Sequence, residues 1–247
     1  MLTVVMPMGG YGTRFRSYTE VSKPLILING LPMFIRSLSC LPLDQIRLVI
    51  FICAKGEAAQ ASEMYRQAGL QNYPHGLFLE ETEPTGVAHC VQLARHHIPH
   101  EDPQLLIHHS DQFLSWDKEE FVKAIDSESA DGIVPLWMTT EKDDWGFAIP
   151  EQGTNWELRG IKPKRSSLDF PYALCGCSYF SDANFYFSAL ADMTEEDLVQ
   201  NEIYVESAYN KMITRGHKVK GFPVKKVFSM GTPEEMVATI DSGIFNE

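Results

Sequence analysis

The sequence predicts an α/β fold: a mostly parallel β-sheet flanked by helices, joined to a small antiparallel lobe. Up to about residue 140, short apolar runs alternate with segments of helical periodicity. The apolar runs are unbroken, which is typical of strands buried on both faces of a parallel sheet. After Trp145 the alternation gives way to short strand-like runs joined by Gly, Pro and Ser. Alternating strands and helices indicate a parallel sheet with helices on both faces. The short strand-like runs after Trp145 indicate antiparallel pairing.

The elements of the first part follow from local signals. Leu2–Met6 is a short apolar run that reads as a buried first strand, and Pro32 suits the first turn of a helix. A helix that ends at Gly69 fits the usual C-terminal glycine. The expected strands are residues 2–6, 47–53, 76–79, 105–108 and 132–136. The expected helices are residues 33–41, 57–68, 86–97 and 118–125.

The second part is expected to form the antiparallel lobe over the edge of the sheet, followed by two helices. The strand-like runs of this lobe are residues 147–149, 156–161 and 173–180, and residues 218–221 and 224–228 separate the two helices that follow. The two expected helices cover residues 202–214 and 233–242.

Composition narrows the class of protein. The chain has 247 residues, which fits one large domain, and 44% of them are hydrophobic, enough for a sizeable core. The net charge of −12 argues against a nucleic-acid partner, which normally needs a basic surface. No apolar stretch is long enough to span a membrane, and the N-terminus lacks the pattern of a signal peptide. The five cysteines are scattered, so a cytoplasmic location with reduced thiols is the simplest expectation.

The most informative motif directly follows the first strand. Gly9-Gly-Tyr-Gly-Thr-Arg-Phe15 places three glycines within four positions, and Arg14 and Lys23 add positive charge beside them. A backbone without side chains lets an anionic group approach its N–H groups closely. The loop lacks the closing residues of a P-loop and the spacing of a dinucleotide fingerprint. We interpret it as a triphosphate site, the alternative being an ordinary glycine turn between a strand and a helix.

A carboxylate stands at the end of another buried strand. Asp111 follows the apolar run that begins at Leu105. Ligands of wound sheets lie at the carboxyl ends of the strands, where the glycine loop and Asp111 are both expected. Mg²⁺ binds one or two carboxylates and completes its shell with phosphate and water. Asp111 is therefore the candidate metal ligand, the alternative being a turn or helix-capping Asp.

The larger pattern, from the glycine loop through Ser22-Lys23-Pro24-Leu25 to Gly231-Thr-Pro-Glu234, resembles the sugar-phosphate nucleotidylyltransferases (nucleoside-diphosphate-sugar pyrophosphorylase-like). The resemblance implies a Rossmann-like, glycosyltransferase-A-like sheet and a Mg²⁺-dependent reaction. Its substrates would be a nucleoside triphosphate and a sugar 1-phosphate. It also implies a single domain over residues 1–247, with a nucleotide-binding half of about residues 1–140 and an acceptor-binding half of about residues 141–247. Many relatives self-associate, so a homo-oligomer is possible.

The resemblance assigns roles residue by residue. It makes Arg14 and Lys23 catalytic and Asp111 the metal ligand. The implied nucleotide-binding residues are Met8, Gly9, Gly10, Gly12, Thr13, Thr85 and Gly86. The implied acceptor-binding residues are Trp145, Gly146, Lys162, Gly176 and Glu202. Local alternatives remain open: a helix cap for Thr85, a turn before an edge strand for Trp145-Gly146, and a favourable helix-start charge for Glu202.

Two positions depart from the family pattern. Ile161 stands where a Glu usually precedes Lys162, and Ser229 stands where a second metal-binding Asp is usual. A hydroxyl is a weaker, neutral ligand, so either Asp111 holds the metal with phosphates and water, or another carboxylate such as Glu206 contributes, or catalysis is impaired. Two alternatives to sugar activation therefore stay open. They are a non-sugar phosphomonoester acceptor of the phosphocholine kind and a non-catalytic nucleotide-binding relative.

Overall fold

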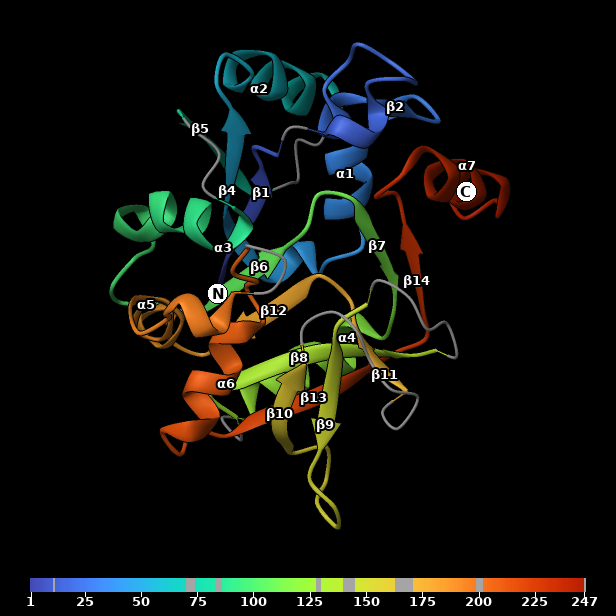
Figure 1. The fold of residues 1–247 in the computed structure, drawn as a ribbon. Helices are drawn as coiled ribbons and strands as arrows, with labels where there is room; N and C mark the ends of the chain where they lie inside the picture. The colour runs from blue at the N-terminus through green and yellow to red at the C-terminus, as the bar shows by residue number, and fades with distance from the viewer. Residues whose placement is uncertain are drawn as a thin grey trace.

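The computed structural model describes residues 1–10, 12–69, 74–82, 86–127, 130–139, 145–162, 171–198 and 202–246. A ten-stranded sheet lies at the centre, in the order β10-β9-β11-β8-β12-β6-β1-β4-β5, with β13 paired to β8 (Figure 1). Its strands are β1 (Leu2–Met8), β4 (Ile46–Ala54), β5 (His75–Glu81), β6 (Leu105–His108), β8 (Gly132–Met138), β9 (Phe147–Pro150), β10 (Leu158–Lys162), β11 (Tyr172–Leu174), β12 (Cys177–Phe180) and β13 (Val219–Val224).

Two small antiparallel sheets and seven α-helices complete the described part of the chain. One small sheet pairs β2 (Leu27–Ile28) with β3 (Leu31–Pro32), and the other pairs β7 (Gln112–Ser115) with β14 (Lys226–Ser229). The helices are α1 (Met33–Leu38), α2 (Ala58–Gln67), α3 (Val87–Cys90), α4 (Lys118–Asp126), α5 (Ala183–Ala191), α6 (Ser207–Thr214) and α7 (Pro233–Asp241).

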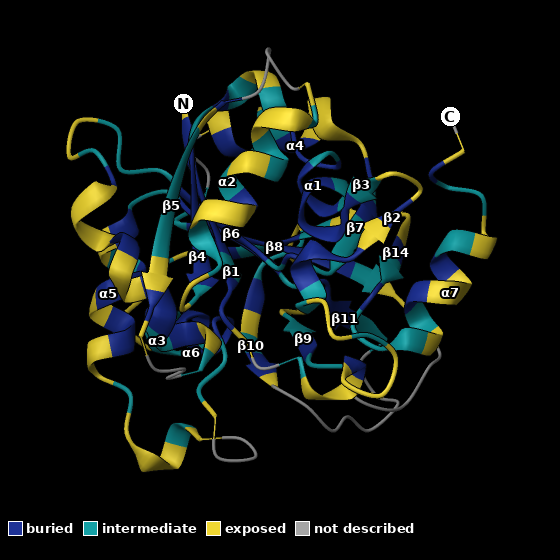
Figure 2. Cartoon of the chain, turned by 90° about the horizontal axis from the view of Figure 1, so that it is seen from above, coloured by how far each residue is buried: buried dark blue, intermediate teal, exposed yellow. Residues whose placement is uncertain are grey.

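The sheet is built around β1, which pairs in parallel with β4 on one side and β6 on the other. Successive side chains of a strand point to opposite faces. Val5 therefore packs with α3, α5 and α6, whereas Val4 and Met6 pack with α1, α2 and α4. Figure 2 shows the buried strands between helices whose outer faces are exposed. The predicted parallel sheet with helices on both faces is confirmed.

Several element predictions need correction. The expected antiparallel strands do pair antiparallel, but β9, β10 and β11 extend the central sheet itself. The single run expected over 173–180 is split into β11 and β12 at Gly176, whose φ of 63° is left-handed. Helix α6 begins at Ser207, so Glu202 lies in the segment that precedes it. The helix expected over 86–97 continues after Cys90 as a 3₁₀ helix. Strand β7 and helix α5 were not predicted.

Candidate active site

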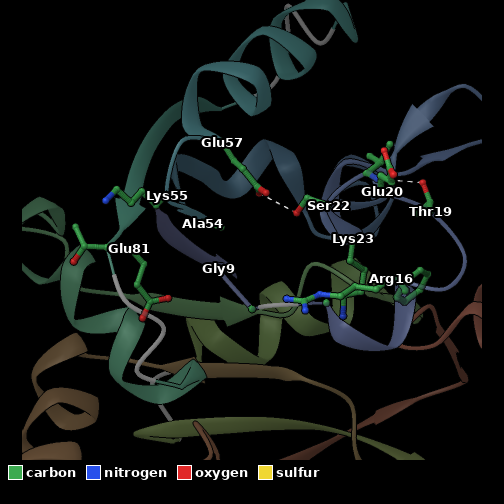
Figure 3. Close-up of a pocket in the computed structure, with 15 residues that line it drawn as sticks. Gly9, Arg16, Thr19, Glu20, Ser22, Lys23, Ala54, Lys55, Glu57 and Glu81 are labelled. Atoms are coloured by element: carbon green, nitrogen blue, oxygen red, sulfur yellow. Dashed lines mark hydrogen bonds between the residues drawn. The ribbon is translucent and has the colours of Figure 1, made fainter.

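A hollow of about 630 Å³ lies at the carboxyl ends of β1 and β4, and the glycine loop forms one wall. Gly9, Gly10 and Gly12 line it together with three cationic residues, Arg16, Lys23 and Lys55 (Figure 3). The loop follows β1 directly, and Lys23 begins a short 3₁₀ helix, Lys23–Leu25, at the opposite wall. The structure thus brings the predicted glycines and Lys23 to one cavity.

Each glycine of this loop has its own steric reason. A Cβ on Gly9 would lie 2.5 Å from Oε2 of Glu81, so a side chain at this position would clash with the carboxylate. Gly12 has a left-handed φ of 54°, and its Cβ would lie 3.3 Å from Cβ of Lys23. A Cβ on Gly10 would meet nothing within 4 Å, so the backbone there faces open space. Gly10 is therefore where an anionic group can approach the backbone.

Lys23 and Asp111 form an ion pair beside this loop. The Nζ of Lys23 lies 2.6 Å from Oδ2 of Asp111, and the two side chains are 21% and 16% exposed. Burial alone would raise the pKa of Asp111, but the neighbouring charge and hydrogen bond of Lys23, with a contribution from His109, outweigh it and lower that pKa. Asp111 is therefore a carboxylate at neutral pH, with an oxygen that already accepts a cation.

Buried contacts fix the turn that carries Asp111. The hydroxyl of Ser37, on α1, lies 2.9 Å from Nε2 of His108 and within 2.8 Å of the backbone carbonyl oxygens of His109 and Gln112. Burial lowers the pKa of His108 to about 4, so its imidazole is neutral here. On the other side of the turn, the backbone N–H of Met230 donates to the carbonyl of Asp111 at 2.8 Å. Asp111 thus projects from a rigid support.

Ser229, at the position of the missing second Asp, belongs to a hydrogen-bonded group. Its Oγ donates to Oε2 of Glu235 at 2.9 Å and accepts from Nε2 of Gln112 at 3.3 Å. Glu235 also caps α7 by accepting from the backbone N–H of Thr232 at 3.0 Å. Within the described ranges, no group of three or more His, Cys, Asp or Glu side chains could hold a metal. Asp111, whose Oδ2 already binds an ammonium group, fits a metal that takes its other ligands from phosphate and water.

A second hollow, of about 280 Å³, continues from the first on the other side of the glycine loop. Met8, Gly86 and Glu202 line it, so three predicted residues from distant parts of the chain converge there. Asp111 and Lys23 also line this hollow, and Lys23 lines the first one as well. Lys23 is therefore shared by the two cavities, and its ion pair with Asp111 lies on the side of the second.

Several residues that line these hollows were missed from the sequence, and Glu81 and Arg16 are the two considered for the glycine loop. Glu81, only 7% exposed, lines both hollows and faces Lys23 and Arg16 across the first one (Figure 3). It is the last residue of β5, so the rule that pointed to Asp111, a carboxylate at a strand end, would have found it. Arg16 lies two positions after Arg14 in the same basic loop, which was the available signal.

The structure separates Arg14 from the glycine hollow. Arg14 is exposed and lines a different hollow of about 260 Å³, together with Thr232 and Glu234 at the start of α7. Thr13 opens the 3₁₀ helix Thr13–Phe15 and is also exposed. Thr85 lies outside the described residues. In this state Arg16, rather than Arg14, presents its guanidinium to the glycine loop (Figure 3).

The expected acceptor-side residues form a second group. A Cβ on Gly146 would lie 2.5 Å from Cδ1 of Leu174 and 3.3 Å from the backbone carbonyl oxygen of Lys162, so the glycine permits close packing against both residues. Trp145 packs edge-to-face on Trp137, with ring centroids 5.6 Å apart. Gly176 abuts His109, whose Nδ1 would lie 2.8 Å from a Cβ at that position. Trp145, Gly146, Lys162 and Gly176 do not line either hollow, whereas Glu202 lines the second.

Comparison with known proteins identifies the class of this chain. The profile of the family described as nucleotidyl transferase matches residues 3–236, nearly the whole sequence. The chain therefore belongs to the nucleotidyl transferase family. Among the residues that the structure describes, no helix combines the length and apolar character needed to cross a membrane.

Curated relatives of this chain act on sugar phosphates, according to their names. The mannose-1-phosphate guanyltransferase of Yarrowia lipolytica is 24% identical over 151 residues, which cover 60% of this chain and 41% of that protein. The glucose-1-phosphate thymidylyltransferase of Streptomyces antibioticus is 26% identical over 182 residues, covering 71% of this chain and 48% of that protein. The chain thus spans less than half the length of the curated relatives it matches.

Solved structures share the fold at low identity. A UDP-glucose pyrophosphorylase in complex with UDP-glucose matches with a TM-score of 0.82 and 15% identity, and the match covers 100% of both chains. The inositol-1-phosphate CTP transferase of T. maritima matches with a TM-score of 0.74 and 13% identity, covering 98% of this chain and 97% of that one. The predicted family and fold class are both confirmed.

Proposed function

We propose that this chain joins a nucleoside triphosphate to a sugar 1-phosphate, releasing pyrophosphate and a nucleotide sugar. The observation that carries the proposal is the Lys23–Asp111 ion pair beside the glycine loop, in which Lys23 lines both hollows and Asp111 lines the second. Binding a triphosphate requires positive charges and backbone N–H groups without a neighbouring side chain, and binding a metal requires a carboxylate. In this structure Lys23, Asp111 and the glycine loop lie side by side. Membership of the nucleotidyl transferase family and the names of the curated relatives support this assignment.

In the proposed reaction, an oxygen of the acceptor phosphate attacks the α-phosphorus in line. The new oxygen–phosphorus bond forms as the bond from the α-phosphorus to the bridging oxygen breaks, and pyrophosphate leaves with that oxygen. A phosphate monoester is already nucleophilic at neutral pH, so no general base is required. Catalysis then consists of positioning and charge stabilisation, as in other phosphoryl-transfer reactions.

The residues divide between the two substrates. We assign residues 1–140 to the nucleotide, with the glycine loop and Arg14 or Arg16 binding the outer phosphates and Lys23 stabilising charge at the α-phosphate. Met8, Thr13, Thr85 and Gly86 would complete the nucleotide site. Mg²⁺ bound to Asp111 would supply charge neutralisation at the triphosphate.

We assign residues 141–247 to the acceptor. Lys162 would bind its phosphate, and the step formed by Trp145 and Gly146, with Gly176 and Glu202, would contact the rest. Gly146 supports this grouping because it lets its segment pack on the backbone of Lys162. The enzyme would use two small phosphorylated substrates, with no nucleic-acid or membrane partner.

A non-sugar phosphomonoester is the second candidate acceptor. Ile161 is 3% exposed and belongs to the hydrophobic core, so this position offers no polar group for a sugar hydroxyl. A protein named as an inositol-1-phosphate CTP transferase shares this fold. Its named substrate is the phosphate of a cyclitol, which is a non-sugar phosphomonoester. This observation favours an acceptor other than an ordinary hexose 1-phosphate.

A pyrophosphate-release screen tests the proposal. The chain is supplied with Mg²⁺ and with each of ATP, CTP, GTP, UTP and dTTP, against a set of sugar 1-phosphates and of other phosphomonoesters such as inositol 1-phosphate and phosphocholine. Release with one sugar 1-phosphate supports the main proposal, and release with a non-sugar phosphomonoester alone supports the second candidate. Nucleotide binding without release for any pair would contradict both and favour a non-catalytic relative.

A further inference from the structure

Asn210 joins helix α6 to strand β10 beside Lys162, one of the predicted acceptor-side residues. It projects from α6 onto β10, at the residue before Lys162. The backbone N–H of Ile161 donates to Oδ1 of Asn210 at 2.7 Å, and Nδ2 of Asn210 donates to the carbonyl oxygen of Ile161 at 2.9 Å. One side-chain amide therefore satisfies both backbone polar groups of one residue.

This contact takes the place of a neighbouring strand. β10 is the terminal strand on its path through the sheet, and Ile161 pairs with Ala148 of β9 on its other side. Both polar groups of Ile161 point away from β9, toward α6, as in a non-hydrogen-bonded antiparallel pair. Part-buried backbone groups need partners, and a carboxamide supplies a donor and an acceptor along one edge. Asn210 therefore fixes the end of β10 against α6.

Helix α6 is itself held firmly. Tyr209, the neighbouring residue, is fully buried, and its hydroxyl lies 2.9 Å from the carbonyl oxygen of Tyr179 and 3.2 Å from that of Ile133. Its ring stacks on Phe180 with centroids 4.7 Å apart. The helix is thereby attached to the central strands β8 and β12, so Asn210 acts from a rigid base.

Each side of this link lies close in the chain to an acceptor contact of the proposed function. Lys162 directly follows Ile161 and ends β10, while Glu202 lies in the segment that leads into α6 and lines the second hollow. We infer that Asn210 is a positioning residue that sets Lys162 relative to Glu202, so that an acceptor can contact both. This inference rests on the proposed function, because it takes Lys162 and Glu202 as the acceptor contacts.

The test compares the Michaelis constants of the two substrates. Asn210→Leu keeps the number and branching of the side-chain heavy atoms, although Leu is bulkier, and removes both hydrogen bonds. Asn210→Ser leaves space for water to satisfy Ile161 if the Leu variant does not fold. We expect either variant to raise KM for the acceptor about tenfold, equivalent to about 1.4 kcal/mol, and to leave KM for the triphosphate within about twofold. Tyr209→Phe is the matched control: it removes a buried hydrogen bond from the same helix without touching β10.

A double-mutant cycle makes the test specific to Lys162. If Asn210 acts through Lys162, then Asn210→Leu has little further effect on acceptor KM in a Lys162→Ala background, because the group being positioned is absent. The inference is overturned if acceptor KM is unchanged in both Asn210 variants, or if Tyr209→Phe raises acceptor KM as much as they do. A wild-type chain that releases no pyrophosphate with any pair instead contradicts the proposed function, and the premise of this inference with it.

Discussion

The ammonium nitrogen of Lys23 lies 2.6 Å from Oδ2 of Asp111, although 88 positions separate the two residues in the chain. Lys23 reaches this position from the loop after β1, and Asp111 from the turn after β6. The two strands are neighbours in the sheet, so their carboxyl ends meet at one edge. The pair holds a cation and a carboxylate ready beside the glycine loop, where the phosphates of a triphosphate would be bound.

The glycine loop gives a matched pair of variants. Gly9→Ala places a methyl group where Oε2 of Glu81 lies, 2.5 Å from the Cβ position, whereas a methyl group at Gly10 meets nothing within 4 Å. We expect Gly9→Ala to displace the carboxylate at the end of the Glu81 side chain and to destabilise the fold by about 1 kcal/mol, the low end for overpacking. Gly10→Ala should keep stability but raise KM for the triphosphate by crowding the backbone.

Thermal unfolding and triphosphate titration separate the two effects. If Gly10→Ala left the affinity for the triphosphate unchanged, the phosphate would not approach the backbone at this glycine. If Gly9→Ala were as stable as the wild type, contact with Glu81 would not be the reason that position 9 requires glycine.

The two arginines of the loop are expected to differ. Arg16 lines the glycine hollow, while Arg14 lines a separate hollow beside Glu234. We expect Arg16→Ala to raise KM for the triphosphate several-fold, since it removes one charge from the cavity wall. Arg14→Ala should lower kcat about 10²-fold if the role implied by the family applies, by analogy with other transition-state donors. Steady-state kinetics of both variants show which arginine binds the phosphates. An Arg14→Ala enzyme with wild-type kcat would contradict the role of Arg14 and assign phosphate binding to Arg16.

Ser229 is expected not to tolerate the acidic residue that is usual at this position. Its Oγ lies 2.9 Å from Oε2 of Glu235, so Ser229→Asp would set two carboxylates side by side. We expect a loss of about 1–2 kcal/mol in the free energy of unfolding. Adding Glu235→Gln should recover most of this loss, because the like charge is removed.

Manganese titration of the same variants reports on the metal site without relying on activity. The double variant, with two carboxylates near the phosphate site, should bind Mn²⁺ more tightly than the wild type. Equal stability of Ser229→Asp and wild type would contradict the contact with Glu235.

Buried His108 predicts a pH-dependent stability. Burial lowers its pKa from 6.5 to about 4. Above pH 6.5 the imidazole is neutral in both states, so its contribution to stability is complete. As the pH falls from 6.5 toward 4, unfolding takes up a proton, and stability declines by up to about 1.4 kcal/mol per pH unit. Chemical denaturation at several pH values in this window should show the slope, and His108→Gln should flatten it. Equal slopes in the two proteins would mean that His108 is not the group responsible.

The sequence predicted the parts of the site that depend on chain order. An apolar run followed by a glycine loop identifies β1 and the wall of the hollow, and a carboxylate after an apolar run identifies Asp111. Those signals are local, and the parallel sheet brings them together by its topology. The same rule applied to Glu81, at the end of β5, would have added it.

Other features depend on contacts between distant segments, which a single sequence does not reveal. Strand β7 is short and forms because β14, more than 100 positions later, pairs with it. The start of α6 at Ser207 rather than Glu202 follows from where the helix meets β10 and β12, not from a capping signal. The direction of an exposed arginine is likewise set by the folded surface, which is why Arg14 was chosen and Arg16 was not.

The most direct test of the account is the turnover of Lys23→Ala, measured by pyrophosphate release with the preferred pair of substrates. Removing the positive charge of Lys23 that lies against Asp111 should lower kcat about 10²–10³-fold, as the loss of other well-placed charge-stabilising donors does. Lys118→Ala is the control, since that lysine donates to the backbone carbonyl of Ser39 and does not line either hollow. A Lys23→Ala enzyme that turns over within a few-fold of the wild type would contradict the assignment of this ion pair to the reacting phosphate.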